Sequence, residues 1–304
     1  MYDTIIIGVG PAGMTAGIYL TRKKINCLVL GQKIGGQIMD GPLIENYPGF
    51  EQITGPDWVE KVQAQMEKLG VEIQLNVEVK KIEKKESSYE VETVSGEKLE
   101  SKSIIIASGK SPRKLKVTGE DQFMGKGISS CVTCDGPLFT GKPVAVIGGG
   151  NSAISAALEL EKYAEKVYVI NLGEALIGEE VRIDQLKKSN KVEIIGGAKT
   201  TEITGEQFVE HLKYKDLKTS EEKEIDVKGI IVEIGWEPST KYLEGFVELT
   251  PAKEIKIDQK CATNTPGVFA AGDVTDVAYK QLVIASGEGA KAALAVWDYL
   301  SSMK

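Results

Sequence analysis

The sequence is poor in the metal-binding residues and in the positive charge that several classes of protein require. It has one histidine, His211, and four cysteines in 304 residues, so a zinc site with its usual four nitrogen or sulfur ligands is not expected. The net charge of -7 and the pI near 5.2 argue against a nucleic acid or an anionic membrane surface as a partner, because either would need a basic patch.

Long apolar runs are also missing. No stretch approaches the roughly 18 consecutive apolar residues of a transmembrane helix. The N-terminal residues Met1-Tyr2-Asp3 lead directly into a strand-like segment rather than into the basic start of a signal peptide. We therefore expect a cytoplasmic protein. The chain length and the 42% hydrophobic content are sufficient for two domains of ordinary size.

Two of the few cysteines form a close pair. Cys131 and Cys134 are separated by two residues and are followed by Asp135, whereas the other two cysteines are isolated. A disulfide in so short a loop removes little entropy from the unfolded chain, which disfavours a purely structural bond. In a reducing compartment such a pair is more often catalytic. The neighbouring carboxylate could exchange protons with the thiols, although Asp135 is also a common turn residue before Gly136-Pro137.

A nucleotide-binding fingerprint stands at the beginning of the chain. Residues 3–7 form a short apolar run, typical of a buried parallel strand, which leads into the GxGxxG pattern from Gly8 to Gly13. The glycines permit the tight turn, the approach of a pyrophosphate and the packing of helix on strand. The helix expected over 14–23 would direct its N-terminal N–H groups at the phosphates. This order of elements predicts dinucleotide binding.

A second fingerprint follows the cysteine pair. Residues 142–147 are strand-like, Gly148 to Ala153 read GxGxxA, and a helix is expected over 154–163. Two such units predict two nucleotides. In the first unit, Gly31 and Gln32 stand where an acid often binds the ribose. The loop after them is long enough to reach a flat heteroaromatic ring, although it could be an ordinary connection.

These motifs together resemble the pyridine nucleotide-disulfide oxidoreductases of the low-molecular-weight thioredoxin reductase type. The wording around Cys134 and around Gly287 is also similar to the reductase core of the alkyl hydroperoxide reductase flavoprotein. The resemblance implies an α/β fold with two Rossmann-like three-layer nucleotide-binding domains, the second inserted in the first. The FAD-binding domain would comprise 1–113 and 245–304, and the nicotinamide nucleotide and disulfide domain would comprise 114–244.

The resemblance also implies functions for individual residues. Cys134 would face the flavin, Cys131 would exchange with the substrate disulfide, and Asp135 would manage protons. The expected FAD-binding residues are Gly8, Gly10, Pro11, Ala12, Gly13, Gly35, Gly36, Gln37, Asn46, Ala107, Gly109, Gly272, Asp273, Lys280 and Gln281. The expected nicotinamide-nucleotide residues are Gly148, Gly150, Asn151, Ser152, Ala153 and Asn171.

The expected activity is reduction of a thioredoxin or glutaredoxin-like protein by an FAD-dependent homodimer. The electron donor is left open by the loop after Asn171, because no basic residue precedes Arg182 and three acids lie in between. A 2′-phosphate should be unfavourable there, so we rank NADH first, a non-nicotinamide donor such as ferredoxin second and NADPH last. A third alternative is a flavin-binding redox sensor without efficient turnover.

Overall fold

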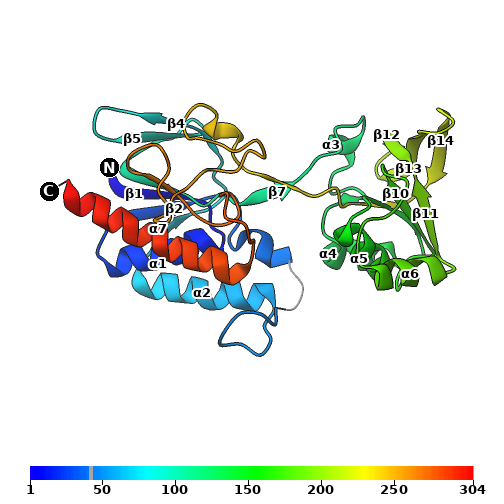
Figure 1. Cartoon of the computed structure of the whole chain (residues 1–304), viewed down its shortest axis with the longest axis horizontal. Helices are drawn as coiled ribbons and strands as arrows, with labels where there is room; N and C mark the ends of the chain where they lie inside the picture. The colour runs from blue at the N-terminus through cyan, green and yellow to red at the C-terminus, as the bar shows by residue number, and fades with distance from the viewer. Residues whose placement is uncertain (41–43, 304) are drawn as a thin grey trace. The chain divides into compact units, whose positions relative to one another are not determined.

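The computed structural model describes residues 1–40 and 44–303, apart from the side chains of Asp40 and Cys134. The chain forms two compact units, Met1–Ser111 with Glu237–Lys304, and Pro112–Trp236, which are drawn in Figure 1. The two crossings between them, β7 (Lys110–Pro112) and β16 (Trp236–Pro238), pair with each other as a two-stranded sheet. This pairing sets the return to the first unit at Glu237, whereas the sequence had suggested residue 245.

The first unit contains a mixed seven-stranded sheet in the order β3-β2-β1-β6-β5-β4, with β17 also paired to β6. Its parallel part is β1 (Tyr2–Ile7), β2 (Cys27–Leu30), β3 (Glu72–Gln74), β17 (Val268–Ala270) and the second half of β6 (Lys98–Ile106). The strands β4 (Val79–Lys84) and β5 (Tyr89–Thr93) extend it as an antiparallel pair.

Three helices cover one face of this sheet, as Figure 1 shows. They are α1 (Pro11–Arg22), α2 (Gly55–Leu69) and α7 (Leu282–Ser302), and the short helices η1 (Gly36–Asp40) and η3 (Lys241–Leu243) belong to the same unit. α1 begins at Pro11, earlier than predicted, because proline is favoured at the first helical position. α7 approaches α1 closely at Gly289, where a Cβ atom would lie 2.1 Å from the carbonyl oxygen of Ala12.

The second unit is built on a parallel five-stranded sheet in the order β11-β10-β9-β15-β8. The strands are β8 (Ile128–Ser129), β9 (Pro143–Ile147), β10 (Lys166–Asn171), β11 (Val192–Gly196) and β15 (Gly229–Val232). The helical segments are α3 (Glu120–Phe123), α4 (Val132–Asp135), η2 (Gly136–Phe139), α5 (Asn151–Leu160) and α6 (Glu180–Lys188).

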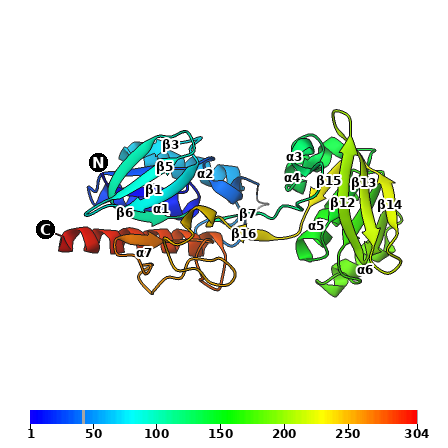
Figure 2. The same ribbon diagram turned by 90° about the horizontal axis from the view of Figure 1, so that it is seen from above.

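A three-stranded antiparallel sheet completes the second unit. It consists of β12 (Ala198–Gly205), β13 (Val209–Asp216) and β14 (Glu222–Asp226), which lie side by side in Figure 2. β15 is buried on both faces, as expected for a strand between two layers. Ile230 and Val232 pack in the core shared with β12 and β13, whereas Ile231 packs in the core shared with α5 and α6.

None of the described helices combines the length and apolar character needed to cross a bilayer.

Candidate cofactor and disulfide site

The first glycine-rich turn is tightly packed at both ends and open in the middle. A Cβ atom at Gly8 would lie 2.1 Å from the carbonyl oxygen of Ala107, and one at Gly13 would lie 1.9 Å from the carbonyl oxygen of Gly8. In contrast, a Cβ atom at Gly10 would meet nothing within 4 Å. Gly10 is the N-cap of α1, and no side chain caps that helix. The first N–H groups of α1 are therefore available to an anion.

Further predicted FAD residues gather around this turn. A Cβ atom at Gly36 would lie 3.5 Å from the Cα atom of Gly10, and one at Gly272 would lie 3.0 Å from the Cβ atom of Ala12. The amide of Gly35 donates to the carbonyl oxygen of Val9 at 2.7 Å.

Two side-chain amides lie further along the same chain segment. Gln37 donates from Nε2 to the carbonyl oxygen of Lys110 at 2.9 Å, next to Gly109. Asn46 donates from Nδ2 to Oε1 of Gln281 at 3.0 Å, at the start of α7. Tertiary structure thus joins residues that are as many as 235 positions apart in the sequence.

Asp273 lies beside a cluster of charged side chains. Burial raises the pKa of its carboxyl group, and the positive charges of Lys280 and Lys110 act in the opposite direction. Both lysines approach the same Oε1 atom of Glu254, at 3.5 Å and 3.0 Å respectively. Lys280 also donates to the carbonyl oxygen of Thr275. Within the described part of the chain, Asp273 itself has no hydrogen-bond or ion-pair partner.

These features fit a dinucleotide cofactor. The open space at Gly10 and the uncapped N-terminus of α1 suit a pyrophosphate. A half-buried carboxyl group without a partner suits a hydroxyl donor such as those of a sugar or ribityl chain. Asp273, Gly272 and the turn would hold such a group together.

The cysteine pair follows β8 in the second unit. Ser129 Oγ accepts a hydrogen bond from the amide of Cys131 at 3.0 Å, and the amide of Asp135 donates to the carbonyl oxygen of Cys131 at 3.1 Å, which closes the single turn α4. Cys131 is disulfide-bonded. The side chain of Cys134 lies outside the described part, so its pairing with Cys131 stays a prediction. Cys27 and Cys261 are free and buried.

The second glycine-rich turn follows β9 and has the same character as the first. A Cβ atom at Gly148 would lie 2.2 Å from the carbonyl oxygen of Glu233, whereas one at Gly150 would meet nothing within 4 Å. Gly150 is the N-cap of α5, which no side chain caps. Ala153 is fully buried behind the turn and Ser152 is exposed. Asn151 Oδ1 accepts a hydrogen bond from the amide of Glu179 at 3.0 Å.

Asn171 differs from what the sequence suggested. Instead of facing outward to a ribose, its side chain is buried and braces its own loop: Nδ2 donates to the carbonyl oxygen of Ala175 at 2.8 Å, and Oδ1 accepts from the amide of Gly173 at 3.3 Å. The physical reason is contact with Gly149, where any Cβ atom would meet the Asn171 amide at 2.1 Å. The loop then returns over the turn, with the amide of Ile177 donating to the carbonyl oxygen of Gly149 at 2.7 Å.

The surface of this loop is apolar and acidic. Leu172 is 63% exposed and Ile177 is 81% exposed. Arg182 already binds within its own unit, with Nε 3.3 Å from Glu179 Oε2 and a guanidinium nitrogen 2.6 Å from Ser155 Oγ. A 2′-phosphate would therefore find no uncommitted guanidinium between residues 171 and 182.

The sequence analysis missed several charged residues near these turns, namely Lys110, Glu233, Glu254 and Glu288. Two of them had a signal in the sequence. Glu233 is an acid directly after the continuous apolar strand β15, and Glu288 is an acid on the apolar face of α7. Glu254 and Lys110 have no such signal, because only the folded chain brings them together.

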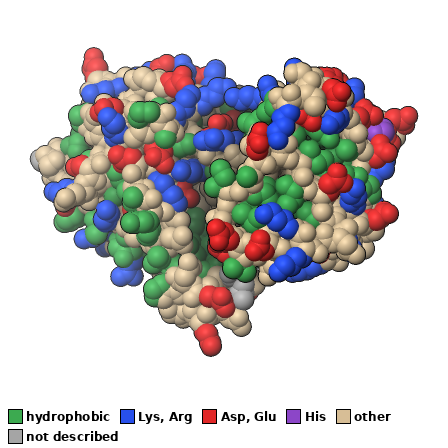
Figure 3. All heavy atoms as spheres, turned by 45° about the vertical axis from the view of Figure 1, so that its right-hand side comes forward, with side chains coloured by type: hydrophobic (Ala, Val, Ile, Leu, Met, Phe, Trp, Pro, Cys, Tyr) green, Lys and Arg blue, Asp and Glu red, His purple; other side chains and the backbone are tan. Residues whose placement is uncertain are grey.

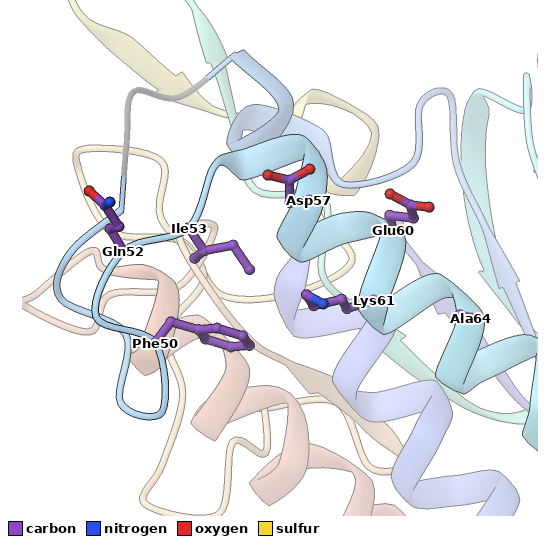
Figure 4. Close-up of a pocket in the computed structure, with 7 residues that line it drawn as sticks. All are labelled: Phe50, Gln52, Ile53, Asp57, Glu60, Lys61 and Ala64. Carbon is purple, nitrogen blue, oxygen red and sulfur yellow. The ribbon is translucent and has the colours of Figure 1, made fainter.

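A separate hollow of about 580 Å³ lies in the first unit between the loop 50–53 and α2. In Figure 4, Phe50 and Ile53 of the loop and Lys61 of α2 point into it. None of the predicted cofactor or disulfide residues lines this hollow. Among the described residues no cluster of histidine, cysteine or acidic side chains could hold a metal ion.

Comparison with known proteins decides the family. Residues 2–289 match the family model of the pyridine nucleotide-disulphide oxidoreductases. The chain belongs to this family. It is 41% identical to an NADH dehydrogenase of Bacillus subtilis and to the alkyl hydroperoxide reductase F protein of Staphylococcus aureus, in each case over 98% of this chain. It covers only 58% and 59% of the length of those two relatives.

The crystal structure of Lactococcus lactis thioredoxin reductase has the same fold, with a TM-score of 0.85 and 35% identity over 99% of this chain and 100% of that one. The predicted fold class and the assignment to an FAD-dependent oxidoreductase are thereby confirmed. Members of this pyridine nucleotide-disulphide oxidoreductase family take electrons from NADH or NADPH.

Proposed function

We propose that this oxidoreductase passes two electrons from NADH through FAD and the Cys131–Cys134 pair to the disulfide of a small thioredoxin-like protein. One observation carries the proposal. Cys131 and the second glycine-rich turn follow β8 and β9, two parallel strands that flank β15 in one sheet. The carboxyl ends of parallel strands lie at one edge, where α/β proteins bind their ligands.

FAD supplies the ability to accept a hydride from a nicotinamide and to release its two electrons to a disulfide. The protein contributes position and protonation. Cys134 is assigned to the flavin side and Cys131 to exchange with the substrate, which requires the thiolate form. Asp135, fixed by its amide to the carbonyl oxygen of Cys131, is assigned to proton transfer.

The donor is ranked by the loop that follows β10. Its exposed surface carries Leu172, Ile177 and Glu174, and the nearest arginine is committed to Glu179 and Ser155. A phosphate with nearly two negative charges is disfavoured next to these acids. NADH lacks this phosphate, so we place it first and NADPH last.

A donor without nicotinamide, such as ferredoxin, is the second candidate. The observation that favours it is the engagement of the Asn171 amide inside its own loop, which leaves the ribose without the hydrogen-bonding group predicted for it. The uncapped α5 and the open space at Gly150 favour a nucleotide, and we therefore keep NADH first.

The physiological substrate is proposed to be a thioredoxin or glutaredoxin-like protein, and the working form a cytoplasmic homodimer. A peroxiredoxin could then be served through such a carrier. Acidic and basic side chains are intermixed on the face drawn in Figure 3. Charge alone therefore does not single out a docking surface there.

Anaerobic stopped-flow mixing of the oxidised flavoprotein with NADH, NADPH or reduced ferredoxin tests the donor order. We expect the flavin absorbance to bleach fastest with NADH, and thioredoxin disulfide to be reduced in the steady state. Fast bleaching by NADPH at micromolar concentration would contradict the donor ranking. Bleaching without any exchangeable thiol would favour the redox sensor instead.

A further inference from the structure

Glu233 is fixed beside the second glycine-rich turn by its main chain. Its amide donates to the carbonyl oxygen of Ile147 at 2.7 Å, directly before Gly148. Its carbonyl oxygen occupies the space that a side chain at Gly148 would need, 2.2 Å from the position of a Cβ atom. Glu233 therefore stands at the end of β15, in contact with the first residue of the fingerprint.

The strand order places this residue on one particular side of the turn. In the order β11-β10-β9-β15-β8, the chain runs from β9 to β10 and β11 on one side, and β15 and β8 lie on the other. A dinucleotide crosses such a sheet at the point of reversal, with its adenosine ribose near the strand that follows the fingerprint. That strand is β10. The other half of the dinucleotide, the nicotinamide riboside, then lies over β15.

The side chain of Glu233 lies on the helical face of the sheet. Ile231 packs with Ala153 and Ile154 of α5, whereas Val232 packs in the core on the opposite face. Because side chains alternate along a strand, Glu233 returns to the face of Ile231, where α4 and the N-terminus of α5 also pack.

The carboxyl group of Glu233 is half-buried and unsatisfied. Burial raises its pKa to about 7, and none of the described residues forms a hydrogen bond or ion pair with it. Buried polar groups normally have a partner, since leaving one unpaired is unfavourable. A ligand that offers amide or hydroxyl donors would supply the partner.

We propose that Glu233 binds the nicotinamide riboside half of the donor nucleotide, with its carboxyl oxygen accepting hydrogen bonds from the carboxamide or the ribose hydroxyls. This inference rests on the proposed nicotinamide donor and adds a residue for which neither fingerprint accounts. It also explains how the site could retain a nucleotide while Asn171 is occupied in its own loop.

Titration of the holoprotein with NADH and, separately, with ADP-ribose tests the inference, because ADP-ribose lacks the nicotinamide riboside. We expect Glu233→Ala to weaken NADH binding by at least about tenfold and to change ADP-ribose binding by less than about twofold. Glu233→Gln should recover part of the loss, since its amide oxygen still accepts hydrogen bonds. Glu237→Gln, at an exposed acid of β16, is the matched control.

Three results would overturn the inference, and they are distinguishable. Equal weakening of NADH and ADP-ribose by Glu233→Ala would mean that the residue only supports the turn. Unchanged NADH affinity in that variant would remove Glu233 from the site while leaving the nicotinamide donor in place. Failure of the wild-type protein to bind either ligand would overturn the nicotinamide donor and the function of Glu233 together.

Discussion

The carboxyl group of Glu288 accepts a hydrogen bond from the backbone amide of Gly272 at 2.7 Å, although the two residues belong to α7 and to the segment that follows β17. Glu288 is only 5% exposed, and the hydroxyl of Thr275 donates to the same Oε2 atom at 3.4 Å. Burial raises the pKa of this carboxyl group. The contact fixes the backbone immediately before Asp273, the residue predicted to bind FAD.

Glu288→Ala should therefore loosen FAD. Removal of the carboxyl group leaves the buried amide of Gly272 without an acceptor, and we expect the FAD dissociation constant to rise by at least about tenfold. Glu288→Gln keeps an acceptor oxygen and should stay close to wild type. Ultrafiltration of the flavoprotein followed by flavin absorbance measures the retained FAD. Asp298→Asn, at an exposed acid of α7, is the control, and equal FAD loss in it would contradict this explanation.

Cys131→Ser should abolish reduction of the protein disulfide while leaving reduction of the flavin by its donor intact, because only the outer sulfur needs to meet the substrate. Steady-state thioredoxin reduction and anaerobic flavin bleaching measure the two steps separately. Cys27→Ala removes a buried free thiol and should leave both steps unchanged. Persistent thioredoxin reduction by Cys131→Ser would reverse the assignment of the two cysteines.

Asp135→Asn should slow the dithiol step far more than it changes stability. General acid–base assistance is typically worth about 10²- to 10⁴-fold, whereas a substitution at the surface usually changes stability by within about 0.5 kcal/mol. Rapid mixing of the reduced enzyme with thioredoxin disulfide measures the step. Asp184→Asn on α6, also exposed, should have no effect. Rates within about twofold of wild type for Asp135→Asn would exclude the proton-transfer function.

The double variant Leu172→Arg/Ile177→Arg should gain activity with NADPH. Both side chains are well exposed, at 63% and 81%, so arginines can replace them without disturbing the core and can chelate a 2′-phosphate. We expect the ratio of kcat/KM for NADPH to that for NADH to rise by at least about tenfold. The pair Leu172→Gln/Ile177→Gln removes the same apolar groups without adding charge. An equal response of both donors would mean that this loop does not contact the adenosine ribose.

The pKa of Glu233 makes stability depend on pH. It is raised from 4.5 to about 7, so the folded protein holds this proton more tightly than the unfolded chain. Ionisation of Glu233 therefore lowers the free energy of unfolding as the pH rises from about 4.5 to about 7, and has no effect below that window. Denaturant titrations should show Glu233→Gln gaining about 1–3 kcal/mol over wild type between pH 4.5 and pH 8. A constant difference across this range, like that expected for Glu237→Gln, would contradict the raised pKa.

Much of the site could be predicted because its motifs are local. Gly8, Gly10 and Gly13 are required by one turn and by the start of one helix. The same physics governs Gly148 and Gly150. Such patterns are specified within a few residues, and the order of strand, turn and helix is legible without any knowledge of distant contacts.

Other parts of the site could not be predicted in this way. The amide of Asn171 was expected to face a ribose, but its packing on Gly149 directs it into its own loop. The boundary at Glu237 depends on the pairing of β7 with β16. Each of these features arises between segments that are far apart in the sequence or that compete for the same space.

The sequence by itself determined that this protein has two nucleotide-binding fingerprints and a closely spaced cysteine pair, because turn geometry and thiol spacing are encoded by neighbouring residues. Only the tertiary structure placed Glu288 under the Gly272 turn and Glu233 beside Gly148. A carboxyl group acquires such a function through burial and through the groups opposite it, and these depend on strand order and helix packing rather than on the residues next to it in the chain.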